Sequence, residues 1–137
     1  MRRFFTLCVF ILFGVIAKGY SSDLVLFTSK TSSFNEIDLS TLRNFYLGRE
    51  KFLGKHKIEI LDFTPSQEGF LKNYVRKDKK LYKLTWRMQL FTGKSLAPKI
   101  FKNKDDLVKY VLENKNVLAY APSSILSPSL KSIKIVK

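Results

Sequence analysis

Short apolar segments alternate with amphipathic segments along most of this chain, and that alternation limits the fold more than any other feature. Leu24–Phe27, Ile58–Phe63 and Val117–Tyr120 are apolar runs of strand length. Between them, apolar residues recur at helical spacing. Strands separated by helices need crossover connections, so the sequence predicts an α/β fold with a mostly parallel sheet flanked by helices. At 137 residues we expect a single domain after any leader is removed.

Capping residues place the helix boundaries. Asp38, Asp78 and Asn103 each precede an amphipathic segment and are predicted N-caps, because their side chains can accept hydrogen bonds from the first free amides. Gly48 and Gly93 are predicted terminators, because glycine adopts the left-handed conformation that ends many helices.

The helix that follows Asp78 has an apolar stripe. Leu81, Leu84, Met88 and Phe91 recur at helical spacing, and we expect this stripe to face the core. The lysines and arginine between these positions then form a solvated helix face.

A further helix start is predicted at the end of the second strand. Thr64 fits an N-cap, Pro65 the first helical position, and Gln67 the return contact of a capping box. A strand that runs into a helix N-terminus presents free amides and the positive end of the helix dipole, which together favour an anion.

The N-terminus has the parts of a secretory signal peptide. Arg2 and Arg3 precede an apolar run from residue 4 to 16, and small residues follow. We expect cleavage after Gly19, so residues 1–19 would be the signal peptide and residues 20–137 the mature domain. The run is too short for a stable membrane span. The predicted location is therefore the periplasm or the cell exterior.

Composition excludes several kinds of chemistry. The only cysteine, Cys8, lies in the predicted leader, so the mature domain would lack disulfides and thiolate ligands. His56 is the only histidine, and no Gly-rich phosphate loop or nucleophile elbow is present. We therefore expect no enzymatic activity, no catalytic residues, no metal and no cofactor.

The chain is strongly basic. Its formal net charge of +14 would fall to +11 on loss of Arg2, Arg3 and Lys18. Such a charge attracts anions in general. Nucleic-acid recognition usually adds aromatic platforms or a known module, and neither is present, so nucleic acid is not an expected partner.

Four segments in order resemble a known family. They are LSTLRNFYLG (39–48), KIEILDFTPSQEGF (57–70), TWRMQLFTG (85–93) and KDDLVKYVLENKNVLAY (104–120). Their order is similar to that of the substrate-binding proteins of phosphate ABC importers, and in particular to small single-lobe relatives. The resemblance implies a single lobe of a type 2 periplasmic-binding-protein fold over residues 20–137.

The resemblance also implies an anion site. Where full-length phosphate binders carry an arginine and an Asp-Gly-Ser-Gly-Thr-like stretch, this chain has the stretch Asp62–Gln67, which keeps only hydroxyl character. The expected ligand-binding residues are Thr64, Ser66 and Gln67, with Thr28 and Ser29 at the end of the first strand.

Two functions remain open from sequence. The first is weak binding of a small phosphate-type anion, or an accessory role in an envelope or transport system, helped by an envelope protein partner or by a homodimer that completes the cleft. The alternative is a protein–protein adaptor derived from the lobe, without a ligand site. A cationic protein that acts on anionic membranes or polymers is a third reading, supported by charge alone.

Overall fold

The computed structural model describes residues 23–93 and 97–137. The predicted signal peptide, residues 1–19, lies outside the described residues. The strands are β1 (Leu24–Ser29), β2 (Glu36–Asp38), β3 (Phe52–Leu53), β4 (His56–Lys57), β5 (Glu59–Phe63), β6 (Lys99–Phe101), β7 (Val117–Pro122) and β8 (Leu130–Val136). The helices are α1 (Leu39–Tyr46), α2 (Gln67–Phe70), α3 (Lys79–Phe91) and α4 (Lys104–Glu113), with short helical turns η1 (Thr64–Ser66), η2 (Leu71–Val75) and η3 (Ser123–Ile125).

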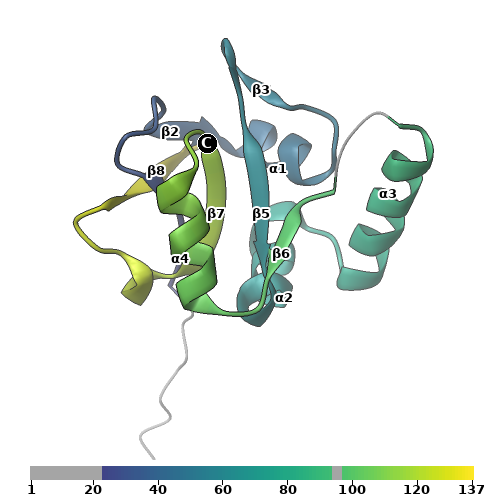
Figure 1. The fold of residues 1–137 in the computed structure, drawn as a ribbon. Coiled ribbons are helices and arrows are strands. Elements are labelled where there is room, and N and C mark those ends of the chain that lie inside the picture. Colours follow the sequence, from purple (N-terminus) through teal and green to yellow (C-terminus); the bar gives the residue numbers. More distant parts are fainter. Residues whose placement is uncertain (1–22, 94–96) are drawn as a thin grey trace, which may run out of the picture.

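A six-stranded sheet in the order β2-β8-β1-β7-β5-β6 forms the centre of the fold. The pairings β2–β8, β7–β5 and β5–β6 are parallel, whereas β1 is antiparallel to both β7 and β8. Figure 1 shows α4 in front of the sheet, α1 behind it, and α3 at the far side of β6. The predicted α/β class, with a mostly parallel sheet flanked by helices, is confirmed.

The predicted N-caps of α1, α3 and α4 and the predicted terminators of α1 and α3 agree with the structure. The Asp38, Asp78 and Asn103 side chains accept from the amides of Ser40, Leu81 and Asp105, at 3.2, 2.7 and 2.7 Å. Gly48 and Gly93 have φ of +73° and +69°, the left-handed conformation expected of them.

The core face of α3 was predicted wrongly. Leu81 and Leu84 are each 47% exposed, Met88 is 63% exposed and Phe91 is 94% exposed. The buried residues of this helix are instead Tyr82 and Trp86. Their polar atoms reach partners inside the protein, since the Tyr82 hydroxyl bonds Asp62 and the Trp86 indole bonds the Tyr46 carbonyl.

An aromatic cluster fills the core between the sheet and the helices α1 and α2. Phe70 stacks on Tyr120 with ring centroids 3.8 Å apart, and its edge meets Tyr46 at 4.7 Å. The Tyr46 hydroxyl donates to the carbonyls of Leu61 and Leu118, at 2.9 and 3.4 Å. This one hydroxyl therefore joins α1 to both β5 and β7.

Candidate functional site

A buried carboxylate lies near the end of β5. Asp62 is only 2% exposed, and its two oxygens accept hydrogen bonds from the hydroxyls of Tyr82 and Tyr120, each at 2.7 Å. The Gln67 side chain also hydrogen-bonds this carboxyl group. Asp62 thus connects β5 to α2, α3 and β7.

Burial controls the electrostatics of this cluster. It raises the pKa of the Asp62 carboxyl above its ordinary value of 3.8, although the hydrogen bonds from Tyr82, Tyr120 and Gln67 act in the opposite direction. Burial and the nearby Asp62 charge also raise the pKa of Tyr82 and of Tyr120 well above 10.0. Both tyrosines therefore keep their protons at neutral pH and remain donors to the carboxylate.

The raised pKa of Asp62 predicts a pH-dependent stability. The folded protein holds the Asp62 proton more tightly than the unfolded chain, so this stabilisation is complete below pH 3.8 and is lost as pH rises through the folded-state pKa. Asp62→Asn keeps the side-chain shape and removes the titration. Urea unfolding measures the free energy of unfolding at pH values from below 3.8 up to neutral pH. Over this range the free energy should fall less in the variant than in the unchanged protein. Parallel pH profiles for the two proteins would contradict this account.

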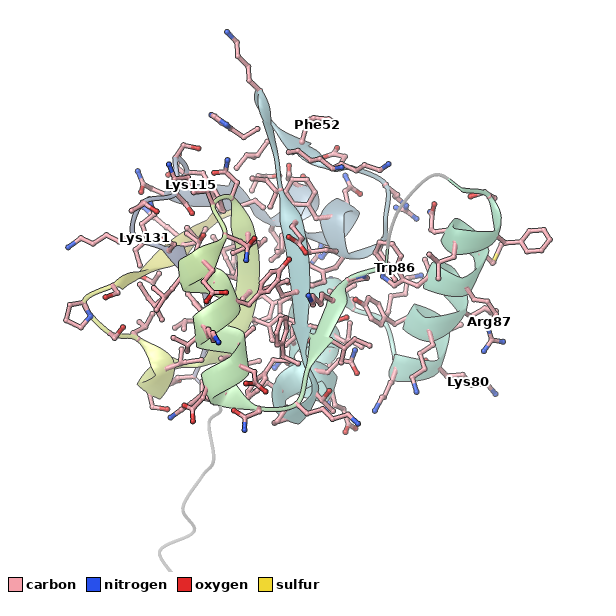
Figure 2. The ribbon with its side chains drawn as sticks, in the orientation of Figure 1. Phe52, Lys80, Trp86, Arg87, Lys115 and Lys131 are labelled. Atoms are coloured by element: carbon pink, nitrogen blue, oxygen red, sulfur yellow. The ribbon has the colours of Figure 1, made fainter. Side chains whose placement is uncertain are left out.

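A groove of about 480 Å³ opens beside this cluster, between α3 and the edge of the sheet at β5 and β6. Its cationic lining residues are Lys79, Lys83, Arg87 and Lys102. Its uncharged polar lining residues are Thr64 and Gln67, its apolar ones are Trp86, Leu90, Ala97, Pro98 and Ile100, and Asp62 and Tyr82 complete it. We call it the basic groove. Figure 2 shows that Arg87 lies on the outer side of α3, so it belongs to the rim.

Three of the expected ligand-binding residues lie at this edge of the sheet. Thr64 is exposed and lines the basic groove, and the buried Gln67 also lines it. Ser66 lies between them in the sequence and is half-buried, but it is not among the lining residues.

The predicted capping box does not form. Thr64 begins a short 3-10 turn, and neither that turn nor α2 has a side-chain cap. The Gln67 side chain bonds the buried Asp62 instead of turning back to the Thr64 amide. Satisfying a buried carboxylate outweighs capping an exposed helix start, because an unpaired buried charge is far more costly.

Thr28 and Ser29 lie at the opposite end of the strands from Thr64, in the interior strand β1. β1 runs antiparallel to β7, which is parallel to β5, so β1 ends where β5 begins. Thr28 exchanges a hydrogen bond with the Ser32 hydroxyl at 2.7 Å, and Ser29 with the Thr31 hydroxyl at 2.9 Å. These hydroxyls close the turn after β1, and the structure does not bring them to the basic groove.

A second cavity, of about 490 Å³, lies near the start of β5. Its charged lining residues have both signs: Glu50 and Glu59 oppose Lys51, Lys57 and Lys115. The basic groove has a larger excess of cations, so it is the better anion candidate. Among residues 23–93 and 97–137, no cluster of acids, histidines and cysteines could hold a metal ion. No helix in those same ranges is long and apolar enough to cross a bilayer.

Sequence reasoning missed the cations of the groove. Lys79, Lys83 and Arg87 are spaced four residues apart, so they occupy one side of α3 next to Tyr82 and Trp86. The sequence contains this spacing, but it is equally typical of a solvated helix face.

The similarity of this chain to known proteins lies in its fold. No protein-family model matches the chain, and no curated protein matches it significantly. Among solved structures, the chain is similar to a protein from Clostridium perfringens assigned as a phosphate ABC transporter substrate-binding protein, solved with bound phosphate. The TM-score is 0.65 at 14% identity, and the match covers 82% of this chain and 44% of that one.

Two further structures agree. An ABC-type phosphate transport receptor from Vibrio cholerae gives a TM-score of 0.55 at 10% identity, covering 82% of this chain and 46% of that one. PstS from Borrelia burgdorferi gives a TM-score of 0.57 at 12% identity, and the match covers 82% of this chain and 47% of that one. This chain therefore spans less than half the length of the proteins it matches. The resemblance inferred from the four segments is confirmed at the level of the fold, which is that of one part of a phosphate-importer substrate-binding protein.

Proposed function

We propose that this chain is an exported solute-binding-protein-like domain that binds a small phosphate-type anion weakly in the basic groove. One observation carries the proposal. Among residues 23–93 and 97–137, four cationic side chains line this groove, whereas the single lining carboxylate, Asp62, is buried and held by hydroxyl and amide donors. Such a site concentrates anions without needing the arginine of the full-length phosphate binders.

The anion would lie between α3 and the end of β5. Lys79, Lys83 and Lys102 supply positive charge from two sides, and the exposed Thr64 hydroxyl supplies a donor. The Gln67 amide is already engaged with Asp62, so it positions the floor of the site more than it contacts the anion. Ser66 lies between the lining residues Thr64 and Gln67 in the sequence and is adjacent to the site without lining it.

Weak affinity follows from the geometry. The lysine ammonium groups are exposed, and exposed charge pairs contribute only about 0.2–1 kcal/mol each. A site that leaves its ligand partly solvated also gains less than a closed cleft. Because the chain spans less than half of its structural neighbours, an envelope protein or a second copy could supply the opposing wall.

The same features support a role in binding and not in catalysis. The similar structures are substrate-binding proteins, and the lining residues that the structure describes include no paired nucleophile and base. Export is part of this proposal because the first residues have the order of a signal peptide, with cleavage expected after Gly19.

Charge removal on α3 tests the site. Lys83→Gln should weaken phosphate binding by up to about fivefold, because it removes one exposed charge contact worth at most about 1 kcal/mol. Lys80→Gln is the matched control, since Lys80 lies on the same helix and does not line the groove. Isothermal titration calorimetry with phosphate and with sulfate measures both variants.

Two outcomes would contradict anion binding in the basic groove. Equal loss in the two variants would mean that general charge, not the groove, attracts the anion. No measurable heat with phosphate, sulfate or carboxylates would favour the adaptor alternative. Pro65 favours that alternative. Proline has no amide hydrogen, so it removes one donor from the strand–helix turn.

A further inference from the structure

The outer side of α3 carries an uncovered apolar stripe. We call it the α3 ridge, and its residues are Leu81, Leu84, Met88 and Phe91. Phe91 is 94% exposed and Met88 is 63% exposed, which is unusual for side chains of this size in a helix. Within the described residues, α3 stands at one side of the molecule and its outer face meets no other element (Figure 1).

The ridge has a definite chemical pattern. At about 100° of rotation per residue, its four side chains fall within an arc of about 80°. Lys80 and Arg87 border that arc on one side, and in Figure 2 both extend away from the sheet. No acidic residue occurs from Lys79 to Gly93. The ridge is therefore a narrow apolar edge with a cationic border.

This pattern indicates which kind of partner binds the α3 ridge. A second copy of the chain would bring the same cations to the contact, and like charges would oppose pairing. A convex ridge that ends in a fully exposed phenylalanine can enter the boundary between lipid headgroups and acyl chains, while lysine and arginine remain beside lipid phosphates. The net charge, +14 for the full chain and +11 without Arg2, Arg3 and Lys18, adds long-range attraction to an anionic surface.

We propose that the α3 ridge binds the surface of an anionic lipid bilayer, with Met88 and Phe91 inserted and Lys80 and Arg87 at the headgroups. The apolar side chains of this contact lie on the opposite side of α3 from Tyr82 and Trp86, and the contact shares only Arg87, at the rim, with the basic groove.

Vesicle binding by the full chain tests the apolar contribution. The double variant Met88→Ser/Phe91→Ser should lose at least about tenfold in binding to vesicles that contain phosphatidylglycerol, because insertion removes large apolar surfaces from water. Phe52→Ser is the matched control, since Phe52 is another phenylalanine that is largely exposed. Co-sedimentation measures both. Equal losses in the two variants would overturn the proposal.

Charge reversal tests the border of the ridge. Lys80→Glu should weaken binding to anionic vesicles more than Lys109→Glu does, because Lys109 lies on α4, away from the ridge. The net charge changes equally in the two variants, so the difference isolates position. Equal behaviour would mean that net charge alone attracts the protein.

A local probe separates α3 from the apolar N-terminal run, which every variant shares. An environment-sensitive fluorophore on Phe91→Cys, in a Cys8→Ser background, should shift to the blue on vesicles with phosphatidylglycerol and not on phosphatidylcholine alone. The same label on Phe52→Cys should shift less. An unshifted label at position 91 would overturn the proposal and leave an acidic protein partner as the remaining occupant. Phosphate calorimetry is independent of these results.

Discussion

Phe70→Ala is expected to lower the free energy of unfolding by about 3–5 kcal/mol, the range for truncating a buried aromatic side chain. Phe70 is fully buried and touches the rings of Tyr46, Tyr74 and Tyr120, with the closest centroid 3.8 Å away. Alanine would leave a cavity bordered by rigid rings that cannot collapse into it. Urea unfolding followed by circular dichroism measures the change.

The location of this cluster makes the loss large. Tyr46 bonds the carbonyls of Leu61 and Leu118, and Tyr120 bonds Asp62, so rings that move into the cavity must also give up buried hydrogen bonds. Phe91→Ala is the matched control, because Phe91 is almost fully exposed and its loss should stay within about 0.5 kcal/mol. A Phe70 variant as stable as this control would show that the cluster does not hold the fold together.

The elements that the sequence predicts correctly depend on local signals. Asp38, Asp78 and Asn103 cap their helices because an N-cap contact spans only two or three residues. The strands β1, β5 and β7 are apolar runs that a covered sheet requires. The short strand β6 has no such run, and Pro98 directly before it is a residue typical of loops.

The orientation of α3 could not be predicted in this way. Its sequence contains two sets of apolar or aromatic residues at helical spacing, one with Tyr82 and Trp86 and the other with Leu81, Leu84 and Met88. Periodicity indicates that such faces exist, but not which one packs on the body. The choice depends on polar partners that are far away in the sequence.

In the candidate site too, the residues that the sequence predicts are those that depend on local signals. Thr64 and Gln67 were found because a strand–helix junction is local. The partners of Asp62 were not, because Tyr82 and Tyr120 are 20 and 58 residues away. Only the fold brings these hydroxyls to the carboxylate and places the lysines of α3 across from Thr64.

Trp86→Ala is expected to release α3 from the body of the protein, at a cost of about 3–5 kcal/mol. The Trp86 side chain is buried, and its indole N–H donates to the Tyr46 carbonyl at 2.9 Å. Its ring also lies against Gly48, where an added Cβ would come within 3.2 Å of it. The basic groove and the second cavity both use Trp86 as a wall, so both sites should change shape.

The release should be local, which gives it a distinct signature. Besides Trp86, α3 is held to the body by the Tyr82–Asp62 bond and by the bond from Gln89 to the Leu47 carbonyl. In hydrogen exchange, amides of α3 should therefore lose protection before amides of β7. Trp86→Phe keeps most of the packing and removes the indole donor, so it should cost about 1–3 kcal/mol through the unpaired Tyr46 carbonyl. Equal loss of protection in α3 and β7 would mean that the helix and the sheet unfold as one unit, and that Trp86 supports the whole core.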